Sequence, residues 1–349
     1  MKFMSRIFTC TFSFLMVVAL STDLLQGQNV KTEATRAYNN ALELAQNQNF
    51  IDAIDLYMEA RELATSPDCE DCSELAQMAT NQIPRVHYSR ASHAFQQFQQ
   101  SKSVEAVDDA IEYFQDAQEA GEEFGDDQVR DRSRSVIPQL YYNKSLVQYN
   151  SGNHEGALES LNRAIELNAN YTLAYYQRGI VLNNTDGVSL EEAIDAFDQA
   201  IEVGERVGDS ENVGRAQRRV RAELVYQAVQ RMDNNQRTQA IELLHRAEEY
   251  QPNHVDVNYR LAQVYNERGN WEQAATYANR ALQQETGGVA DRAKIYFELG
   301  LAYQGQGTSM KQQACNAFEN AAYGEFQGPA HHKLEYELEC EGYASANGQ

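Results

Sequence analysis

Residues 255–288 read VDVNYRLAQVYNERGNWEQAATYANRALQQETGG, and this stretch predicts two antiparallel helices joined by a tight turn. Gly-Asn-Trp at 269–271 forms the turn, and the second helix runs over residues 274–282. Ala262 and Ala274 are small enough for the helices to approach to roughly 8–10 Å, and a larger side chain there would overpack the contact by roughly 1–3 kcal/mol. The stretch is therefore predicted to be one helix-turn-helix unit.

The pattern of its second helix recurs along the chain. An Ala is followed four residues later by a second residue, usually bulky and apolar, and three further on by another Ala. The leading Ala residues lie 57, 47, 36, 47, 34 and 40 positions apart, so the spacing is 34 residues plus inserts of varying length. A repeat of this kind predicts helix pairs that stack on their neighbours. The triplets are Ala53/Tyr57/Ala60, Ala110/Phe114/Ala117, Ala157/Leu161/Ala164, Ala193/Phe197/Ala200, Ala240/Leu244/Ala247, Ala274/Ala278/Ala281 and Ala314/Phe318/Ala321.

These triplets, the turn at 269–271 and Tyr-Phe-Glu-Leu-Gly at 296–300 make residues 34–343 resemble a secreted bacterial tetratricopeptide repeat (TPR) protein. The resemblance implies an all-α fold, a TPR superhelical solenoid of about seven helix-turn-helix repeats with a C-terminal capping helix. It also implies a concave groove, lined by the first helices, that holds an extended or helical segment of a partner protein. The identity of that partner is not implied, because TPR arrays serve many partners.

The resemblance also implies which residues face the groove. Chaperone-binding members grip a carboxylate with Lys, Arg and Asn at such places, but here Tyr142, Leu146 and Gln177 stand there, so that clamp is not expected. An alternative is that several of the Tyr residues pack between repeats as core. The groove places fall on Tyr142, Tyr149, Tyr176, Asn183, Tyr259, Gln263, Asn266 and Phe297, with Leu146, Ile180, Asn184 and Gln304 beside them.

The inserts and the chain ends suggest how the chain is organised. Residues 29–135 are expected to hold divergent repeats with extended connections, and residues 136–343 the regular array and its capping helix. Residues 344–349 are small and polar and are expected to form a flexible tail. Gly-Asp pairs at 125–126 and 208–209 are expected to break the chain before extra helical turns.

Residues 1–28 have the pattern of a signal peptide. Lys2 and Arg6 precede an apolar run over residues 7–20, which as a helix would span only about 21 Å, too short for a bilayer. We expect cleavage between Ser21 and Gln28 and an exported protein, periplasmic or extracellular, with no membrane span after cleavage. An uncleaved anchor is the alternative.

The formal net charge of −22 argues against nucleic acid as a partner, because phosphate contacts need an excess of Lys and Arg. The acidity is spread along the chain and indicates a solvated surface. Adaptation to salt or a basic partner are the alternatives.

Four Cys follow the signal segment, and in an exported chain they predict two disulfides, Cys69 with Cys72 and Cys315 with Cys340. A redox pair or half a zinc site are the alternatives for Cys69 and Cys72, and the nearby acids offer a weak calcium alternative. No metal and no cofactor are expected.

The sequence contains no nucleophile elbow, phosphate loop, dinucleotide fingerprint or zinc-protease motif, and no catalytic residues are predicted. The main hypothesis is a non-enzymatic protein-protein interaction scaffold of the cell envelope, which binds a protein or peptide in its groove. The alternative is glycan or peptidoglycan binding through the aromatic residues. A third, enzymatic hypothesis depends only on the Cys69-Cys72 pair.

Overall fold

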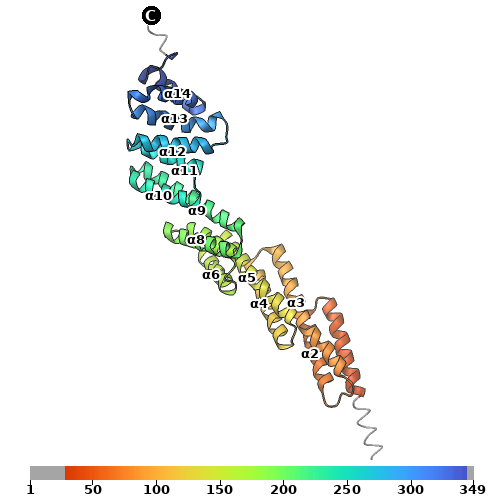
Figure 1. Cartoon of the computed structure of the whole chain (residues 1–349). Helices are drawn as coiled ribbons and strands as arrows, with labels where there is room; N and C mark the ends of the chain where they lie inside the picture. Colours follow the sequence, from red (N-terminus) through yellow and green to blue (C-terminus); the bar gives the residue numbers. More distant parts are fainter. Residues whose placement is uncertain (1–27, 344–349) are drawn as a thin grey trace, which may run out of the picture. The chain divides into compact units, whose positions relative to one another are not determined.

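The computed structural model describes residues 28–343, and its regular elements in that range are helices (Figure 1). They form two compact units that divide between Ala193 and Ile194, inside α8. The elements are a helix over residues 28–46, α2 (Phe50–Thr65), α3 (Ser73–Ser101), α4 (Val104–Glu123), α5 (Asp127–Asn150), α6 (His154–Leu167), α7 (Thr172–Asn183), α8 (Leu190–Val207), α9 (Ser210–Asp233), α10 (Arg237–Tyr250), α11 (Val255–Glu267), α12 (Trp271–Gln284), α13 (Val289–Gly305), α14 (Lys311–Ala321), α15 (Gln327–His332) and short turns at Thr308–Met310, Gly324–Phe326 and Lys333–Glu337.

All the Ala triplets lie in the expected second helices, namely α2, α4, α6, α8, α10, α12 and α14. Every one of their side chains is buried, with Phe114 the most exposed at 2 %. The small Ala side chains let each second helix pack closely against its neighbours, and the burial of the triplets reflects this packing, as the sequence pattern predicted. The prediction of an all-α array of helix pairs is confirmed for the described residues.

The two Gly-Asp pairs form the breaks that the sequence predicted. Gly125 and Gly208 have φ angles of 74° and 78°, in the left-handed region that glycine adopts without steric cost. The following Asp then caps the next helix. The Asp126 carboxylate accepts a hydrogen bond from the Val129 amide at 3.0 Å, and the Asp209 carboxylate accepts one from the Asn212 amide at 3.2 Å.

The first helices of several repeats are longer than the sequence indicated. The regular array was expected to begin at residue 136, yet α5 starts at Asp127 and continues through Pro138. Proline removes one helical hydrogen bond, but Ile137 and Pro138 are both buried, so packing outweighs that loss. The expected division between residues 135 and 136 therefore falls inside a continuous helix.

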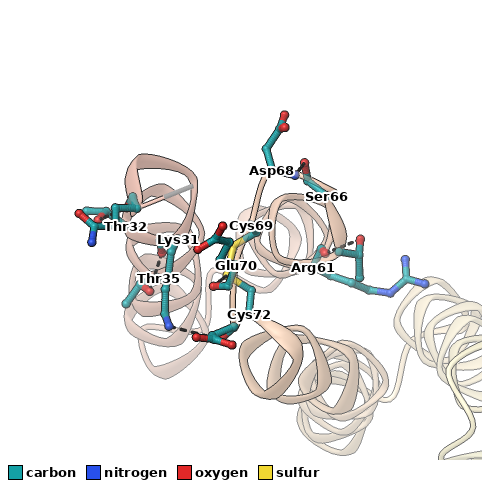
Figure 2. Close-up of a disulfide and its surroundings, with 12 residues drawn as sticks. Lys31, Thr32, Thr35, Arg61, Ser66, Asp68, Cys69, Glu70 and Cys72 are labelled. Atoms are coloured by element: carbon teal, nitrogen blue, oxygen red, sulfur yellow. Dashed lines mark hydrogen bonds between the residues drawn. A yellow bond between two sulfur atoms is a disulfide. The ribbon is translucent and has the colours of Figure 1, made fainter. Parts of the chain in front are cut away.

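The loop between α2 and α3 contains a disulfide that joins Cys69 to Cys72, with a Cα–Cα distance of 5.7 Å (Figure 2). Cys72 is buried and stands directly before α3. In Figure 2 the side chain of Lys31, from the helix over residues 28–46, reaches the loop, where it donates a hydrogen bond to the Asp71 carbonyl at 3.2 Å. The bridged loop is thus held against the first described helix.

The C-terminal cap is more broken than the single amphipathic helix that was expected. It consists of α15 followed by a π-helical turn at Lys333–Glu337. Leu334 is fully buried, whereas Tyr336 is exposed. A disulfide joins Cys315 in α14 to Cys340 beyond the turn, with a Cα–Cα distance of 6.0 Å, and both residues belong to a buried cluster with Phe318.

The expected signal segment (residues 1–28) and tail (residues 344–349) lie outside the described residues, apart from Gln28 at the start of the first helix. None of the helices described between residues 28 and 343 has the length and apolar character needed to cross a membrane.

We expect both bridges in the protein isolated from cells, and we expect loss of the Cys315–Cys340 bridge to loosen the C-terminal cap. The bridge closes a loop of 25 residues, which corresponds to about 3–4 kcal/mol of loop-closure free energy. In a Cys315→Ser/Cys340→Ser variant, hydrogen exchange should accelerate in residues 311–343 and stay unchanged in α11. The matched Cys69→Ser/Cys72→Ser variant should leave residues 311–343 unaffected, and equal exchange in both variants would contradict the assignment.

Candidate functional site

The C-terminal unit contains a cavity of about 450 Å³ beside the first helices of its last two repeats. Side chains from α11 and α13 contribute most of its walls, with the first residue of α12 and the turn after α15 completing them. The lining residues are Gln263, Asn266, Glu267, Trp271, Glu298, Leu301, Gln304, Gly305 and Lys333.

A buried pair of polar side chains lies in the cavity wall. The Asn266 side-chain amide donates one hydrogen bond to the Glu298 backbone carbonyl at 2.8 Å and another to Oε2 of the Glu298 carboxyl at 2.7 Å. Asn266 is 7 % exposed and Glu298 is 6 % exposed. The pair ties α11 to α13 across the space between two successive repeats.

Burial raises the pKa of the Glu298 carboxyl to about 7, because desolvation penalises its charged form. The hydrogen bond from Asn266 and the charge of Arg260 act in the opposite direction, whereas the negative charge of Glu267 adds to the rise. The carboxyl of Glu298 therefore changes its charge near neutral pH, unlike an exposed Glu.

The other walls combine apolar and paired charged groups. Trp271 and Leu301 are half-buried, and the Trp271 backbone carbonyl accepts a hydrogen bond from the Gln306 side chain at 3.2 Å. Two ion pairs lie at the edge. Glu267 pairs with Arg237 at 3.0 Å, and Lys333 pairs with Glu337 at 2.8 Å.

Three of the residues at predicted groove places, Gln263, Asn266 and Gln304, line this cavity. Gln263 is half-buried and accepts a hydrogen bond from Arg260 at 3.0 Å. Tyr259 is only 7 % exposed and does not line the cavity, and burial raises the pKa of its hydroxyl to about 12.

Phe297 packs into the C-terminal core. Its ring lies 5.5 Å from that of Phe318 in an edge-on arrangement and 5.4 Å from that of Phe326. Such geometry is typical of aromatic rings that stabilise a core. Phe297 is therefore used at least in part for packing between α13 and the residues after it.

The remaining predicted residues lie in the N-terminal unit, where two of them also contact other rings. Tyr142 lies 5.5 Å from Tyr171, and Tyr149 stacks on His154 at 5.3 Å. Tyr176 and Asn183 are half-buried on α7. Partner binding by these four residues stays a prediction.

The sequence interpretation did not assign Glu298 or Trp271 to the site. A signal for Glu298 exists, since it is the one acid within the apolar stretch Tyr-Phe-Glu-Leu-Gly at 296–300, which was used only as a repeat signature. The repeat pattern buries this face of the helix. A carboxylate that lies alone there is a candidate for a perturbed pKa, because burial disfavours its charge.

The described residues contain no group of three or more His, Cys, Asp or Glu side chains placed to hold a metal ion. Cys69 and Cys72 are joined to each other in the structure.

Two segments of the chain match sequence families of the same repeat. Residues 231–295 match a family described as "Tetratricopeptide repeat", and residues 146–185 match one described as "TPR repeat". The first includes α11, the turn at 269–271 and α12. No curated protein sequence matches the chain. Together with the helix pairs and the buried Ala triplets, these matches define a tetratricopeptide repeat fold.

Solved structures with similar helix arrays include MamA residues 41 to the end from Desulfovibrio magneticus RS-1, at 19 % identity, a TM-score of 0.33, and coverage of 55 % of this chain and 96 % of that one. YrrB, titled a TPR protein with an unusual peptide-binding site, shows 19 % identity, a TM-score of 0.32 and coverage of 60 % and 93 %. The TPR2AB domain of yeast Sti1, in a complex with pHSP90, shows 13 %, 0.31, and 88 % and 96 %. At such low identities and scores, the assignment rests on the repeat matches and the helix pairs.

The perturbed pKa of Glu298 predicts how stability depends on pH. Because the pKa rises from 4.5 to about 7 on folding, the folded state holds the proton more tightly, and stability should fall as pH rises from about 5 to 8. At about 1.4 kcal/mol for each pKa unit, this span corresponds to about 3 kcal/mol.

Denaturant unfolding at pH 5 and pH 8 measures this change in the free energy of unfolding. The fluorescence of Trp271, the single Trp of the chain, reports on it from the same cavity wall as Glu298. Glu298→Gln keeps an acceptor for Asn266 and removes the titration, so its stability should change less with pH than that of the wild type. An identical pH dependence of both proteins would show that Glu298 is ionised at little cost.

Proposed function

We propose that this protein is a non-enzymatic scaffold of the cell envelope that binds an extended segment of a partner polypeptide against the first helices of its repeats. The observation that supports it best is the cavity between α11 and α13. It is lined by Gln263 and Asn266, two residues at places that the repeat pattern assigns to partner contacts. Repeat arrays of this kind present surfaces to protein partners and generally lack catalytic pockets.

The packing of the aromatic residues favours a polypeptide over a glycan as the ligand. Sugar binding needs ring faces that are open to the ligand. One face of Tyr149 stacks on His154 with ring centroids 5.3 Å apart. Tyr142 and Phe297 pack at an angle against Tyr171 and Phe318, with centroids 5.5 Å apart, which reduces the ring surface open to a sugar. The cavity itself offers amide and carboxyl groups beside Trp271 and Leu301, which suits the mixed polar and apolar character of a peptide.

The proposal places the protein outside the cytoplasm, and its support is the signal-like sequence of residues 1–28. We expect the protein in the envelope or the medium to start with an N-terminus created by cleavage between Ser21 and Gln28. Mass spectrometry of N-terminal peptides from each cell fraction measures this. A protein that keeps Met1 and stays in the cytoplasmic fraction would rule out export by cleavage.

Site-specific photo-crosslinking in cells that produce the protein tests the binding role. A benzoyl-phenylalanine at position 304 replaces Gln304 in the cavity wall, and one at position 319 replaces Glu319, which is exposed on α14. We expect a discrete polypeptide adduct from position 304 and none from position 319.

Two results would count against the proposal. An adduct that resists protease but is removed by a peptidoglycan hydrolase would identify a glycan ligand. Equal adducts from both positions would show that the cavity wall is not a specific contact surface.

A further inference from the structure

We propose that the cavity between α11 and α13 receives a cationic side chain, lysine or arginine, from the bound segment, with its charged end at Asn266 and Glu298 and its stem against Trp271 and Leu301. This inference rests on the proposed function and specifies what the segment must carry. It follows from unused hydrogen-bond acceptors, from the charge balance of the lining, and from the apolar walls.

The cavity wall contains acceptor atoms that no donor among the described residues satisfies. Asn266 uses its amide nitrogen for both bonds to Glu298, and its Oδ1 atom is buried without a partner. From the residues that the structure describes, the Glu298 carboxyl receives a hydrogen bond only at Oε2. Both side chains are more than nine-tenths buried. A buried acceptor without a donor costs about 1–3 kcal/mol, so a ligand group that donates several hydrogen bonds fits this wall.

Within residues 28–343, no ion pair joins Glu298 to a cationic side chain. Glu267 is matched by Arg237, and Lys333 is matched by Glu337. The charge of Arg260 acts on Glu298 without an ion pair between them. Its Nη1 donates to Gln263, its Nε lies 3.8 Å from Asp256, and that Nε is buried without a hydrogen-bond partner among the described residues. An anionic ligand would meet Glu267 and Glu298 directly. An ammonium or guanidinium group would supply the missing positive charge and form charge-assisted hydrogen bonds.

The cost of ionising Glu298 adds to this selectivity. Desolvation makes the charged form of the carboxyl unfavourable inside the protein, and this penalty is the reason its pKa is raised. A cation placed against it would favour the ionised form and recover that loss. The Glu298 carboxylate is therefore unfavourable on its own and would become favourable when a cationic side chain is bound against it.

The remaining walls suit the stem of a long basic side chain. Trp271 and Leu301 present apolar surface, and the Trp271 ring packs directly against Gly305, in the space that a Cβ at that position would need. Lys and Arg bury their methylene stems along apolar surfaces while the charged end finds polar partners, and a Trp ring face attracts cations. The cavity, at about 450 Å³, falls within the usual size range of sites for small ligands.

A peptide selection measures the preference. Purified protein without its signal segment is immobilised and exposed to a degenerate octapeptide library, and the bound peptides are sequenced. We expect Lys or Arg to be enriched at one position. The best peptide is then compared with copies that carry citrulline or norleucine there, by titration of Trp271 fluorescence. The neutral copies should bind at least about tenfold more weakly, equivalent to about 1.4 kcal/mol.

Two variants assign this discrimination to Glu298. Glu298→Gln keeps the shape of the side chain and should bind the cationic and neutral peptides equally. Glu319→Gln removes the same charge from an exposed site on α14 and should keep the tenfold difference. Leu301→Lys, a variant with a tethered ammonium in the cavity, should block the cationic peptide and so tests the site even if Glu298→Gln folds poorly.

The outcomes separate this inference from the proposed function. Peptides that bind without a preference for Lys or Arg would overturn the inference and leave peptide binding intact, as would a preference that survives in both Glu298→Gln and Leu301→Lys. A wild-type protein that retains no peptide from the library would count against the proposed function itself.

Discussion

Close contact between helices through Ala is the interaction on which the rest of the structure depends. Each second helix presents Ala at two or three places of its buried face, and those side chains are almost completely removed from solvent. An Ala contributes little apolar area, but it lets a neighbouring helix approach until larger side chains such as Tyr57, Phe197 and Phe318 fill the space around the contact. The array is thus stabilised unit by unit, each pair of helices depending on those beside it.

Much of this could be predicted from the sequence, because the contact is encoded locally. The Ala spacing located every second helix, and the Gly-Asp pairs located the starts of α5 and α9. The continuation of α5 through Pro138 could not be predicted, because local propensity disfavours an internal proline and only burial against neighbouring helices compensates for it. The interruption of the capping helix could not be predicted either, because the path of the chain after Pro329 depends on the packing of Leu334 and Cys340 in the buried cluster around Phe318.

In the candidate site, too, some residues could be predicted from the sequence and others could not. The resemblance to TPR proteins was enough to suggest Gln263 and Asn266, since it implies that both occupy groove-facing places on a first helix. Glu298 was not found, because its significance depends on a neighbour 32 residues earlier in the chain, whose position follows from the stacking of two repeats. A buried carboxyl also carries a desolvation cost, and its position in a cavity wall makes Glu298 a candidate for the proposed binding role.

The placement of the two disulfides has a consequence for how the array comes apart. A stacked repeat protein ordinarily unzips from its ends, where each terminal pair has only one neighbour. Here one bridge secures the loop that follows the first helix pair, and the other fastens the last helix pair to the residues after it. The first bridge joins residues only three positions apart, so it stiffens its own loop without tying the first helix pair to the next, whereas the second holds the residues after α14 to the last pair. The array should therefore open first at its N-terminal end, and an invading protease would make its earliest cut there.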